Sequence, residues 1–331
     1  MIITRTPFRI SFFGGGTDYP AWYREHGGAV LSTTIDKYCY VSCRSLPPFF
    51  EHKHRLVYSQ IENVTDISEI KHPSVKATLN WANITEGVEL HHDGDLPARS
   101  GLGSSSSFTV GLINALNGWQ GRLSTKEGLA KNAIHIERNL IGESVGSQDQ
   151  IAAAYGGFNK IEFFKNDSFA VSPVIVEPSR LCYFQSHLML FFTGFSRTAN
   201  EIAKSKIENF SSSTNELRSI RQMVDQGMEI LNDNNFEILE FGHLLHKGWI
   251  QKKRLSEKVS SDKIDEMYDA ALNAGAIGGK ILGAGGGGFM LLFAPPEMHL
   301  KITERLKNLV KVNFKFEDSG SKIVLYQPNG L

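Results

Sequence analysis

The sequence lacks the features that would place a protein of this size in a membrane, on nucleic acid or in an oxidising compartment. Its longest apolar runs, such as residues 289–294, are far too short to span a bilayer, and the N-terminus lacks the charged-then-apolar layout of a signal peptide. Lys and Arg together number 35, as do Asp and Glu, so no net charge attracts a polyanion. The three cysteines suit packed thiols in a reducing cytosol. We therefore expect a cytoplasmic protein with no nucleic-acid or membrane partner.

The chain also lacks a Walker-type phosphate-binding loop, because G-x-x-x-x-G-K-[ST] does not occur in it. A different segment, PARSGLGSSSSF at residues 97–108, offers comparable chemistry. Gly101 and Gly103 let the backbone turn tightly and approach a ligand, and Ser104–Ser107 open a helix whose free N–H groups attract anions. A single serine would suffice to cap that helix. The run of four therefore predicts a phosphate cradle, with a hard oxygen ligand available for Mg²⁺.

A second glycine-rich segment ends the first expected strand. Residues 2–13 place apolar side chains on one face and polar side chains on the other, and GGGTD follows directly. Thr17 and Asp18 then stand where a ligand could meet them. A tight turn with Asp18 as its cap explains the same residues equally well.

The third glycine-rich segment, residues 278–293, contains a match to the dinucleotide-binding fingerprint G-x-G-x-x-G at Gly283, Gly285 and Gly288. In that fingerprint the glycines follow a strand and open a helix, whereas here they run into the apolar stretch 289–293. A dinucleotide-dependent oxidoreductase is therefore disfavoured. Residues 142–146 read G-x-S-x-G, the hydrolase nucleophile elbow, but a helical stretch precedes them where the elbow needs a strand.

The order of expected elements predicts an α/β or α+β architecture in two domains. Besides the first strand, we expect a strand at about 29–44 and a helix at 126–142. A break near residues 177–181 is followed by a fresh set of elements: a strand, long helical stretches, the glycine-rich segment, and further strands and a helix. The chain is long enough for two domains, which we place at 1–178 and 179–331.

The three glycine-rich segments, in this order and spacing, resemble the signatures of the GHMP kinases (galactokinase, homoserine kinase, mevalonate kinase and phosphomevalonate kinase). They read P-x-R-I-x-F-x-G-G-G-T-D, S-G-L-G-S-S-S-S and G-A-G-G-G-G. The further details GGGTDYP, LPPFFEHKHR and GSQDQ are most similar to bacterial D-glycero-D-manno-heptose 7-phosphate kinases, and fucokinases share parts of the pattern. The resemblance covers essentially the whole chain.

The resemblance implies a GHMP kinase fold and a reaction. The N-terminal domain would be a ribosomal-protein-like βαβ domain with a left-handed crossover, the C-terminal domain would be ferredoxin-like, and the active site would lie between them. The implied activity is Mg²⁺- and ATP-dependent phosphorylation of the anomeric hydroxyl of D-glycero-D-manno-heptose 7-phosphate, giving the 1,7-bisphosphate for nucleotide-activated heptose synthesis. A kinase for a neutral sugar such as fucose or galactose is the alternative, and a non-catalytic protein of this fold is a remote one. A homodimer is possible.

The resemblance also assigns roles to residues. Asp149 would be the catalytic base with Arg9 beside it, and Ser104 and Glu137 would hold Mg²⁺. Glu137 has independent support, because it shares an apolar helical row with Ile134 and Ile141 and has no Lys or Arg three or four residues away. The nucleotide phosphates would contact Gly101, Leu102, Gly103, Ser104, Ser105, Ser106 and Ser107. The substrate would contact Arg9, Gly15, Gly16, Thr17, Asp18, Arg197, Gly285 and Gly286, with Arg197 the first choice for a substrate phosphate and Lys37 and Arg99 the second choices.

Overall fold

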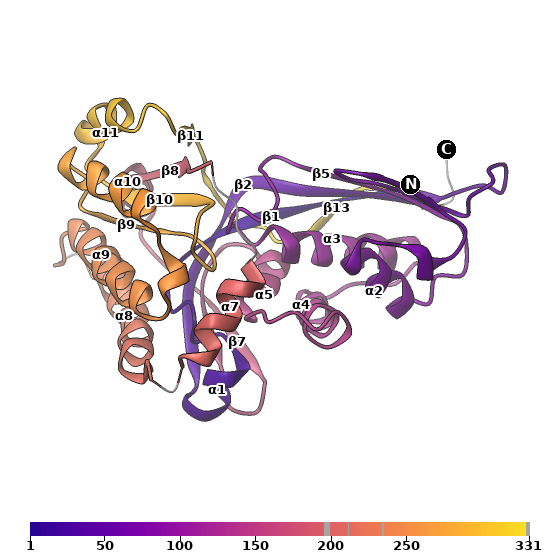
Figure 1. Ribbon diagram of the computed structural model, residues 1–331, viewed down its shortest axis with the longest axis horizontal. Helices are drawn as coiled ribbons and strands as arrows, with labels where there is room; N and C mark the ends of the chain where they lie inside the picture. The colour runs from indigo at the N-terminus through magenta and orange to yellow at the C-terminus, as the bar shows by residue number, and fades with distance from the viewer. Residues whose placement is uncertain (195–198, 211, 234, 329–331) are drawn as a thin grey trace.

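The computed structural model describes residues 1–194, 199–210, 212–233 and 235–328, so the candidate Arg197 lies outside the described residues. Two sheets organise the molecule (Figure 1). The larger has nine strands in the order β13-β1-β2-β5-β3-β4, with β6 and β12 also paired to β2 and β7 paired to β6. Its strands are β1 (Ile2–Phe13), β2 (Gly28–Ser45), β3 (His54–Val57), β4 (Ile61–Val64), β5 (Val88–Gly94), β6 (Phe158–Phe163), β7 (Phe169–Pro173), β12 (Phe316–Glu317) and β13 (Lys322–Tyr326).

Helices cover one face of the larger sheet, and Figure 1 shows α2, α3 and α4 beneath it. The central helix α3 follows the serine run and is buried on nearly all sides, because its apolar residues pack against β1 and β2. The expected helix at 126–142 is α4 continued by a single π-helical turn, η2. The bounds are α1 (Pro20–His26), α2 (Pro73–Trp81), α3 (Ser104–Trp119), α4 (Lys126–His135), η2 (Ile136–Leu140) and α5 (Gln148–Tyr155), with a 3-10 turn at Ile67–Glu69.

A βαβ unit lies within this part of the chain. Strands β3 and β5 pair in parallel, and α2 lies in the connection between them. Strands β1 and β2 pair in antiparallel register from Ile2 opposite Cys43 to Phe13 opposite Leu31, close to the predicted bounds of both strands. This long pair carries the first glycine-rich turn to one end of the sheet.

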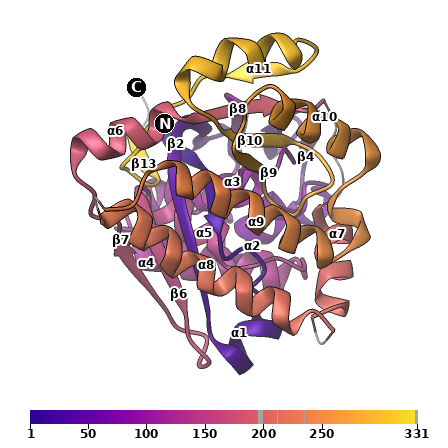
Figure 2. The same cartoon turned by 90° about the vertical axis from the view of Figure 1, so that its left-hand side faces the viewer.

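The smaller sheet has the strand order β11-β8-β10-β9, and its three pairings are antiparallel. Numbered along the chain, these strands are in the order 4-1-3-2, with helices between the first and second and between the third and fourth, which is the ferredoxin-like arrangement that we expected. Helices α8 and α9 lie side by side at this end of the molecule (Figure 2). The bounds are α6 (Pro178–Ser186), β8 (Leu188–Phe192), α7 (Ala199–Glu208), α8 (Thr214–Asn232), α9 (Leu239–Arg254), α10 (Asp262–Asn273), β9 (Gly278–Ile281), β10 (Phe289–Phe293), α11 (His299–Arg305) and β11 (Val310–Val312), with 3-10 turns at Glu257–Val259 and Pro296–Met298.

The two sheets are joined through one apolar core. Phe12 of β1 makes ring contacts with Phe184 and Phe241, at centroid distances of 5.6 and 5.4 Å. Strands β12 and β13 return from the ferredoxin-like part to pair with β2 and β1. The two parts are therefore held together by a shared core and by the returning chain, which fixes the walls of the cleft between them. The boundary at 178/179 stays a prediction.

Within residues 1–194, 199–210, 212–233 and 235–328, every helix is too short or too polar to cross a membrane.

Candidate active site

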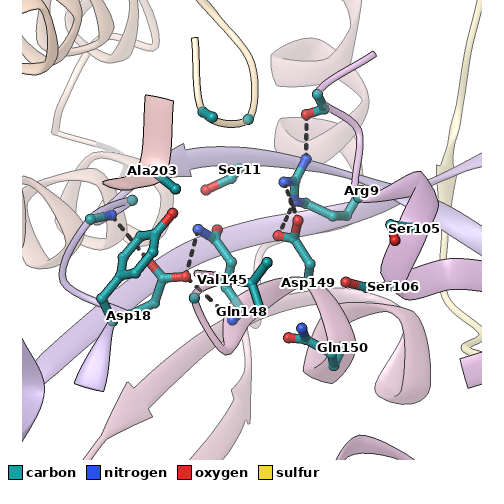
Figure 3. Close-up of a pocket in the computed structure, with 18 of the residues that line it drawn as sticks. Arg9, Ser11, Asp18, Ser105, Ser106, Val145, Gln148, Asp149, Gln150 and Ala203 are labelled. Atoms are coloured by element: carbon teal, nitrogen blue, oxygen red, sulfur yellow. Dashed lines mark hydrogen bonds and ion pairs between the residues drawn. The ribbon is translucent and has the colours of Figure 1, made fainter. Parts of the chain in front are cut away.

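A cavity of about 310 Å³ opens between the two sheets, and all three glycine-rich segments contribute to its wall (Figure 3). The N-terminal part supplies the end of β1, the turn after it, the start of α3 and the segment before α5. The C-terminal part supplies α7, α9 and β9. The segments that line the cavity include Arg9, Gly15–Gly16, Asp18–Tyr19, residues 99–106 in part, Glu137, residues 143–150 in part, Ala203, Lys206, Lys252, Lys280 and Gly283–Ala284.

Arg9 and Asp149 form a two-pronged ion pair inside this cavity. Arg9 projects from β1, and its Nε and Nη2 donate to the two carboxylate oxygens of Asp149 at 2.8 and 2.7 Å. Its third prong, Nη1, donates to the Gly101 carbonyl at 2.6 Å. Arg9 is only 3% exposed, whereas the side chain of Asp149 is 27% exposed, so the carboxylate remains open to the cavity. Such a pair fixes the direction of the carboxylate before any ligand arrives.

The loop before α3 depends on glycine. Gly103 caps the helix with a left-handed backbone at φ 76°, and a Cβ there would lie 3.3 Å from Cγ of Arg9 and 3.5 Å from Cγ of Asp149. The Leu102 carbonyl accepts a hydrogen bond from the Arg9 backbone N–H at 3.0 Å. The helix N-terminus is thus fastened beside the ion pair with its free N–H groups available to an anion.

The four serines have different surroundings. Ser104, Ser105 and Ser106 line the cavity. Ser107 points away, because its hydroxyl donates to the Pro7 carbonyl at 2.9 Å, and the buried Leu102 also lies outside the wall. The predicted cradle is therefore represented in the wall by Gly101, Gly103 and Ser104–Ser106.

Glu137 is fully buried and lines the cavity beside Ser106, on the π-helical turn η2. Its Oε2 accepts hydrogen bonds from the Ser106 hydroxyl at 2.9 Å and from Gln150. Its Oε1 is buried without a partner among the described residues. Burial raises the pKa of Glu137 to about 7, although neighbouring hydrogen-bond donors partly oppose this rise. An ionised carboxylate with one unpartnered oxygen fits a divalent cation better than it fits an empty apolar site.

The hydrogen bonds show which serine of the run contacts Glu137, and it is not Ser104, the serine predicted to share the metal with Glu137. Ser106 bonds to the carboxylate, whereas the Ser104 hydroxyl accepts a hydrogen bond from the Arg99 backbone N–H at 3.0 Å. In a helix the residue two positions on faces a different side, so the sequence could not tell which serine of the run meets Glu137. The geometry places the Ser106 hydroxyl against the Glu137 carboxylate, whereas the Ser104 hydroxyl is engaged by the Arg99 backbone N–H.

Asp18 lies on the other side of the ion pair from Ser105 and Ser106 (Figure 3). Its Oδ1 accepts from the Gly16 N–H at 2.9 Å, and its Oδ2 accepts from Gln148 Nε2 at 3.0 Å. Burial raises the pKa of Asp18, and the charge of Asp149 adds to the rise. Only glycine fits at position 146 next to Asp18, because a Cβ there would lie 1.9 Å from Asp18 Oδ2. That requirement explains the glycine of the G-x-S-x-G match, which follows the π-helical turn and no strand.

Not every predicted substrate residue reaches the cavity. Gly15 and Gly16 line it, but Thr17 does not, because its hydroxyl donates to the carbonyls of Gly14 and Ala29 and fastens the turn to β2. Of the second choices for a substrate phosphate, Arg99 lines the cavity, whereas the Lys37 amine contacts Asp36 at 3.1 Å.

The third glycine-rich segment forms strand β9, a turn and strand β10, and the two strands pair in antiparallel register. This strand–turn–strand context excludes the dinucleotide fingerprint, as expected. Gly283 and Ala284 line the cavity in place of the predicted Gly285 and Gly286. The Gly286 N–H instead donates to the Val259 carbonyl at 2.7 Å, so this part of the turn faces η3 (Glu257–Val259).

Three lysines that the sequence analysis did not single out also line the cavity: Lys206 on α7, Lys252 on α9 and Lys280 on β9. All three are buried. The sequence pattern could have indicated two of these lysines as buried. Lys206 follows the buried Ile202 by one helical turn, and Lys280 lies within a short glycine-rich strand. A charged side chain on a buried row needs a specific reason to be there.

Comparison with known proteins identifies the family and the fold of the chain. Residues 70–157 match the GHMP kinases N terminal domain, and residues 234–310 match the GHMP kinases C terminal domain. The D-glycero-alpha-D-manno-heptose 7-phosphate kinase of Campylobacter jejuni is 31% identical over 92% of this chain and 93% of that protein. The bifunctional fucokinase/GDP-fucose pyrophosphorylase of Arabidopsis thaliana is 25% identical over 93% of this chain but only 31% of its own length. A D-glycero-D-manno-heptose 1-phosphate kinase structure from Bacteroides thetaiotaomicron superposes with a TM-score of 0.79, covering 97% of this chain and 98% of that one at 24% identity, which shows the shared fold.

Proposed function

The chain belongs to the GHMP kinases and is a sugar kinase, and from that premise we propose that it transfers the γ-phosphoryl group of Mg·ATP to the anomeric hydroxyl of a sugar phosphate. D-glycero-D-manno-heptose 7-phosphate is the acceptor we favour. It is the sugar phosphate for which the Campylobacter jejuni relative is named, and that likeness spans nearly the whole chain. A neutral sugar such as fucose is the second candidate, supported by the weaker likeness to the Arabidopsis thaliana fucokinase.

The observation that carries the proposal is the position of the Arg9–Asp149 pair. It lies between the serine-opened helix on one side and Asp18 on the other (Figure 3). A phosphoryl donor held at Ser104–Ser106 and an acceptor held at Asp18 would therefore meet at Asp149. Phosphoryl transfer requires the acceptor hydroxyl to lie next to the γ-phosphoryl group with a base within reach of its proton.

In the proposed reaction, Asp149 accepts the proton of the acceptor hydroxyl. The hydroxyl oxygen forms a bond to the γ-phosphorus, and the bond from that phosphorus to the oxygen bridging to the β-phosphate breaks. Arg9 orients the Asp149 carboxylate through two hydrogen bonds. The positive charge of Arg9 also offsets the negative charge on the transferred phosphoryl group. Asp18 and Gln148 present a carboxylate and an amide to the remaining sugar hydroxyls.

On the donor side, the N–H groups at the start of α3 and the hydroxyls of Ser104–Ser106 would bind the phosphates of ATP. Glu137 and Ser106 are the residues that fit Mg²⁺, through the unpartnered Oε1 and the nearby hydroxyl. When bound there, Mg²⁺ would neutralise charge on the β- and γ-phosphates.

The test is a comparison of acceptors by coupled assay of ADP release. We expect kcat/KM for the heptose 7-phosphate to exceed that for the unphosphorylated heptose, fucose and galactose by roughly ten- to a hundredfold, the effect of one or two charge-assisted contacts. The product should no longer react as a reducing sugar, because its anomeric oxygen is blocked. A preference for a neutral sugar would replace the proposed acceptor with the fucokinase-like one.

A further inference from the structure

Three lysine amines converge on the C-terminal wall of the cavity from three separate elements. Lys206 of α7 is 4% exposed, Lys252 of α9 is 6% exposed and Lys280 of β9 is 8% exposed. All three line the same cavity as Arg9 and Asp18. Buried lysines are rare in proteins, and those that occur are usually paired with a carboxylate.

These lysines have no such pairing within the ranges that the structure describes. Among the described residues, no carboxylate lies within ion-pair distance of any of the three amines, although ion pairs occur elsewhere in the chain. Lys252 donates to the carbonyls of Ile281 and Gly283 at 2.7 and 2.8 Å. Lys280 donates to the carbonyls of Ser11 and Phe12 at 3.0 and 2.7 Å. Lys206 has neither kind of partner within the part of the chain that the structure describes.

The donors that remain unused point to an anion. A lysine ammonium has three donors, so Lys252 and Lys280 each keep one after their two carbonyl contacts, and Lys206 keeps all three. Burial lowers the pKa of Lys206 to about 8 and that of Lys280 to about 7, and it lowers the pKa of Lys252 strongly, with neighbouring cations adding to the effect at Lys252 and Lys280. Fixed cations in a low-dielectric wall are costly unless a ligand brings the opposite charge.

The lysines lie on the acceptor side of the cleft. Lys280 contacts the carbonyls at the end of β1, just before the turn that leads to Asp18. The negative charge of Asp18 also acts on Lys206. The donor side already has its own phosphate cradle at Ser104–Ser106, on the opposite sheet. A second anion site is therefore built where the acceptor would lie.

We propose that Lys206, Lys252 and Lys280 form a subsite for the phosphate group that the acceptor already carries. This proposal rests on the sugar phosphate acceptor argued above. Lys252 and Lys280 also fasten the glycine-rich turn and the end of β1 through their carbonyl contacts, so their replacement would disturb the fold of the cleft. Lys206 makes no such contact with any residue that the structure describes, and it is the residue that tests the subsite.

The experiment compares Lys206→Gln with Lys204→Gln, its exposed neighbour on the same helix, and with Lys206→Arg, which keeps the charge. Each variant is assayed with the heptose 7-phosphate and with the unphosphorylated heptose. Orthophosphate is then titrated as an inhibitor against the unphosphorylated sugar, and its binding is measured by calorimetry with the nucleotide site filled by Mg²⁺ and a non-hydrolysable ATP analogue.

We expect Lys206→Gln to reduce the ratio of the two kcat/KM values by about ten- to a hundredfold and to weaken orthophosphate by a similar factor, with Lys206→Arg restoring part of both losses. Lys204→Gln should change neither by more than about twofold. Equal losses on both acceptors, or an unchanged ratio, would overturn the subsite and leave the proposed acceptor standing. If the parent enzyme uses only neutral sugars, the proposed acceptor fails; Lys206-dependent orthophosphate binding would still support the anion subsite, and its absence would overturn it.

Discussion

The two walls of the cleft satisfy their charges in different ways. On the N-terminal wall, Arg9 and Asp149 bind each other, and Asp18 accepts hydrogen bonds from Gln148 and from the backbone. On the C-terminal wall, Lys252 and Lys280 donate to carbonyl oxygens, and Lys252 Nζ also lies 5.8 Å from the centroid of the Trp249 ring. Lys206 contacts no partner among the described residues.

The difference separates residues that the fold holds in place from residues that a ligand must neutralise. A paired carboxylate keeps its direction without a substrate, which suits a base that must be ready before the acceptor arrives. An unpaired buried cation raises the free energy of the empty protein, which suits a group whose charge is compensated only on binding. Glu137 belongs with the second kind, because its Oε1 has no hydrogen-bond partner in the described part of the chain.

The largest expected effect comes from replacing Asp149 in the ion pair of the N-terminal wall. Asp149→Asn removes the proton acceptor while keeping the shape of the side chain, so kcat should fall by about 10²–10⁴. The affinity for ATP should change little, because Asp149 does not belong to the serine cradle. Steady-state kinetics and nucleotide titration measure the two effects separately.

A matched control exists on the surface. Arg24 and Asp167 form the same two-pronged pair, at 2.8 and 3.0 Å, outside the cavity wall. Asp167→Asn should leave kcat within about twofold of the parent, because the pair is exposed. Full kcat in Asp149→Asn would show that positioning without a base suffices for transfer.

A smaller effect, on the free energy of unfolding, is expected when Lys206 of the C-terminal wall is replaced. Lys206→Met replaces a buried cation with an apolar side chain, so the ligand-free variant should be more stable than the parent at pH 7 by roughly 1–3 kcal/mol. The folded pKa of Lys206, about 8, lies below its ordinary value, so the cost is full below pH 8 and disappears as pH rises towards 10.5. Urea unfolding of parent and variant at pH 7 and pH 9.5 measures the difference in their free energies of unfolding, which should be smaller at pH 9.5.

The exposed Lys204→Met serves as the control, with an expected change within about 0.5 kcal/mol at either pH. A Lys206→Met variant that is less stable than the parent at pH 7 would mean that the amine has a stabilising partner in the folded protein.

Much of the fold could be predicted because local pattern decided it. The alternation in residues 2–13 and the glycines after it set β1 and its turn, and the serine run set the start of α3. Arg9 and Asp149 were proposed from the resemblance to the GHMP kinases, Glu137 from the resemblance and from its apolar helical row, and Asp18 from its place after the first glycine-rich turn.

The rest depends on packing that the sequence does not display. Several neighbouring glycines of the β9–β10 turn have positive φ, so the composition alone could not show that Gly283 and Ala284, and not Gly285 and Gly286, face the cavity. The lysines lie on three elements far apart in the chain, and only the closed fold brings their amines to one wall.

The most direct test of a cleft divided into donor and acceptor halves is one crossed measurement. Glu137→Gln and Lys206→Gln are each titrated for Mg²⁺-dependent binding of a non-hydrolysable ATP analogue and assayed for the KM of the heptose 7-phosphate. We predict that Glu137→Gln raises the Mg²⁺ requirement by about tenfold or more and changes the acceptor KM by less than about threefold. Lys206→Gln should raise the acceptor KM by about tenfold or more and leave nucleotide binding within about threefold. If either variant shifts both constants by similar factors, the cleft is not divided in this way and the account is contradicted.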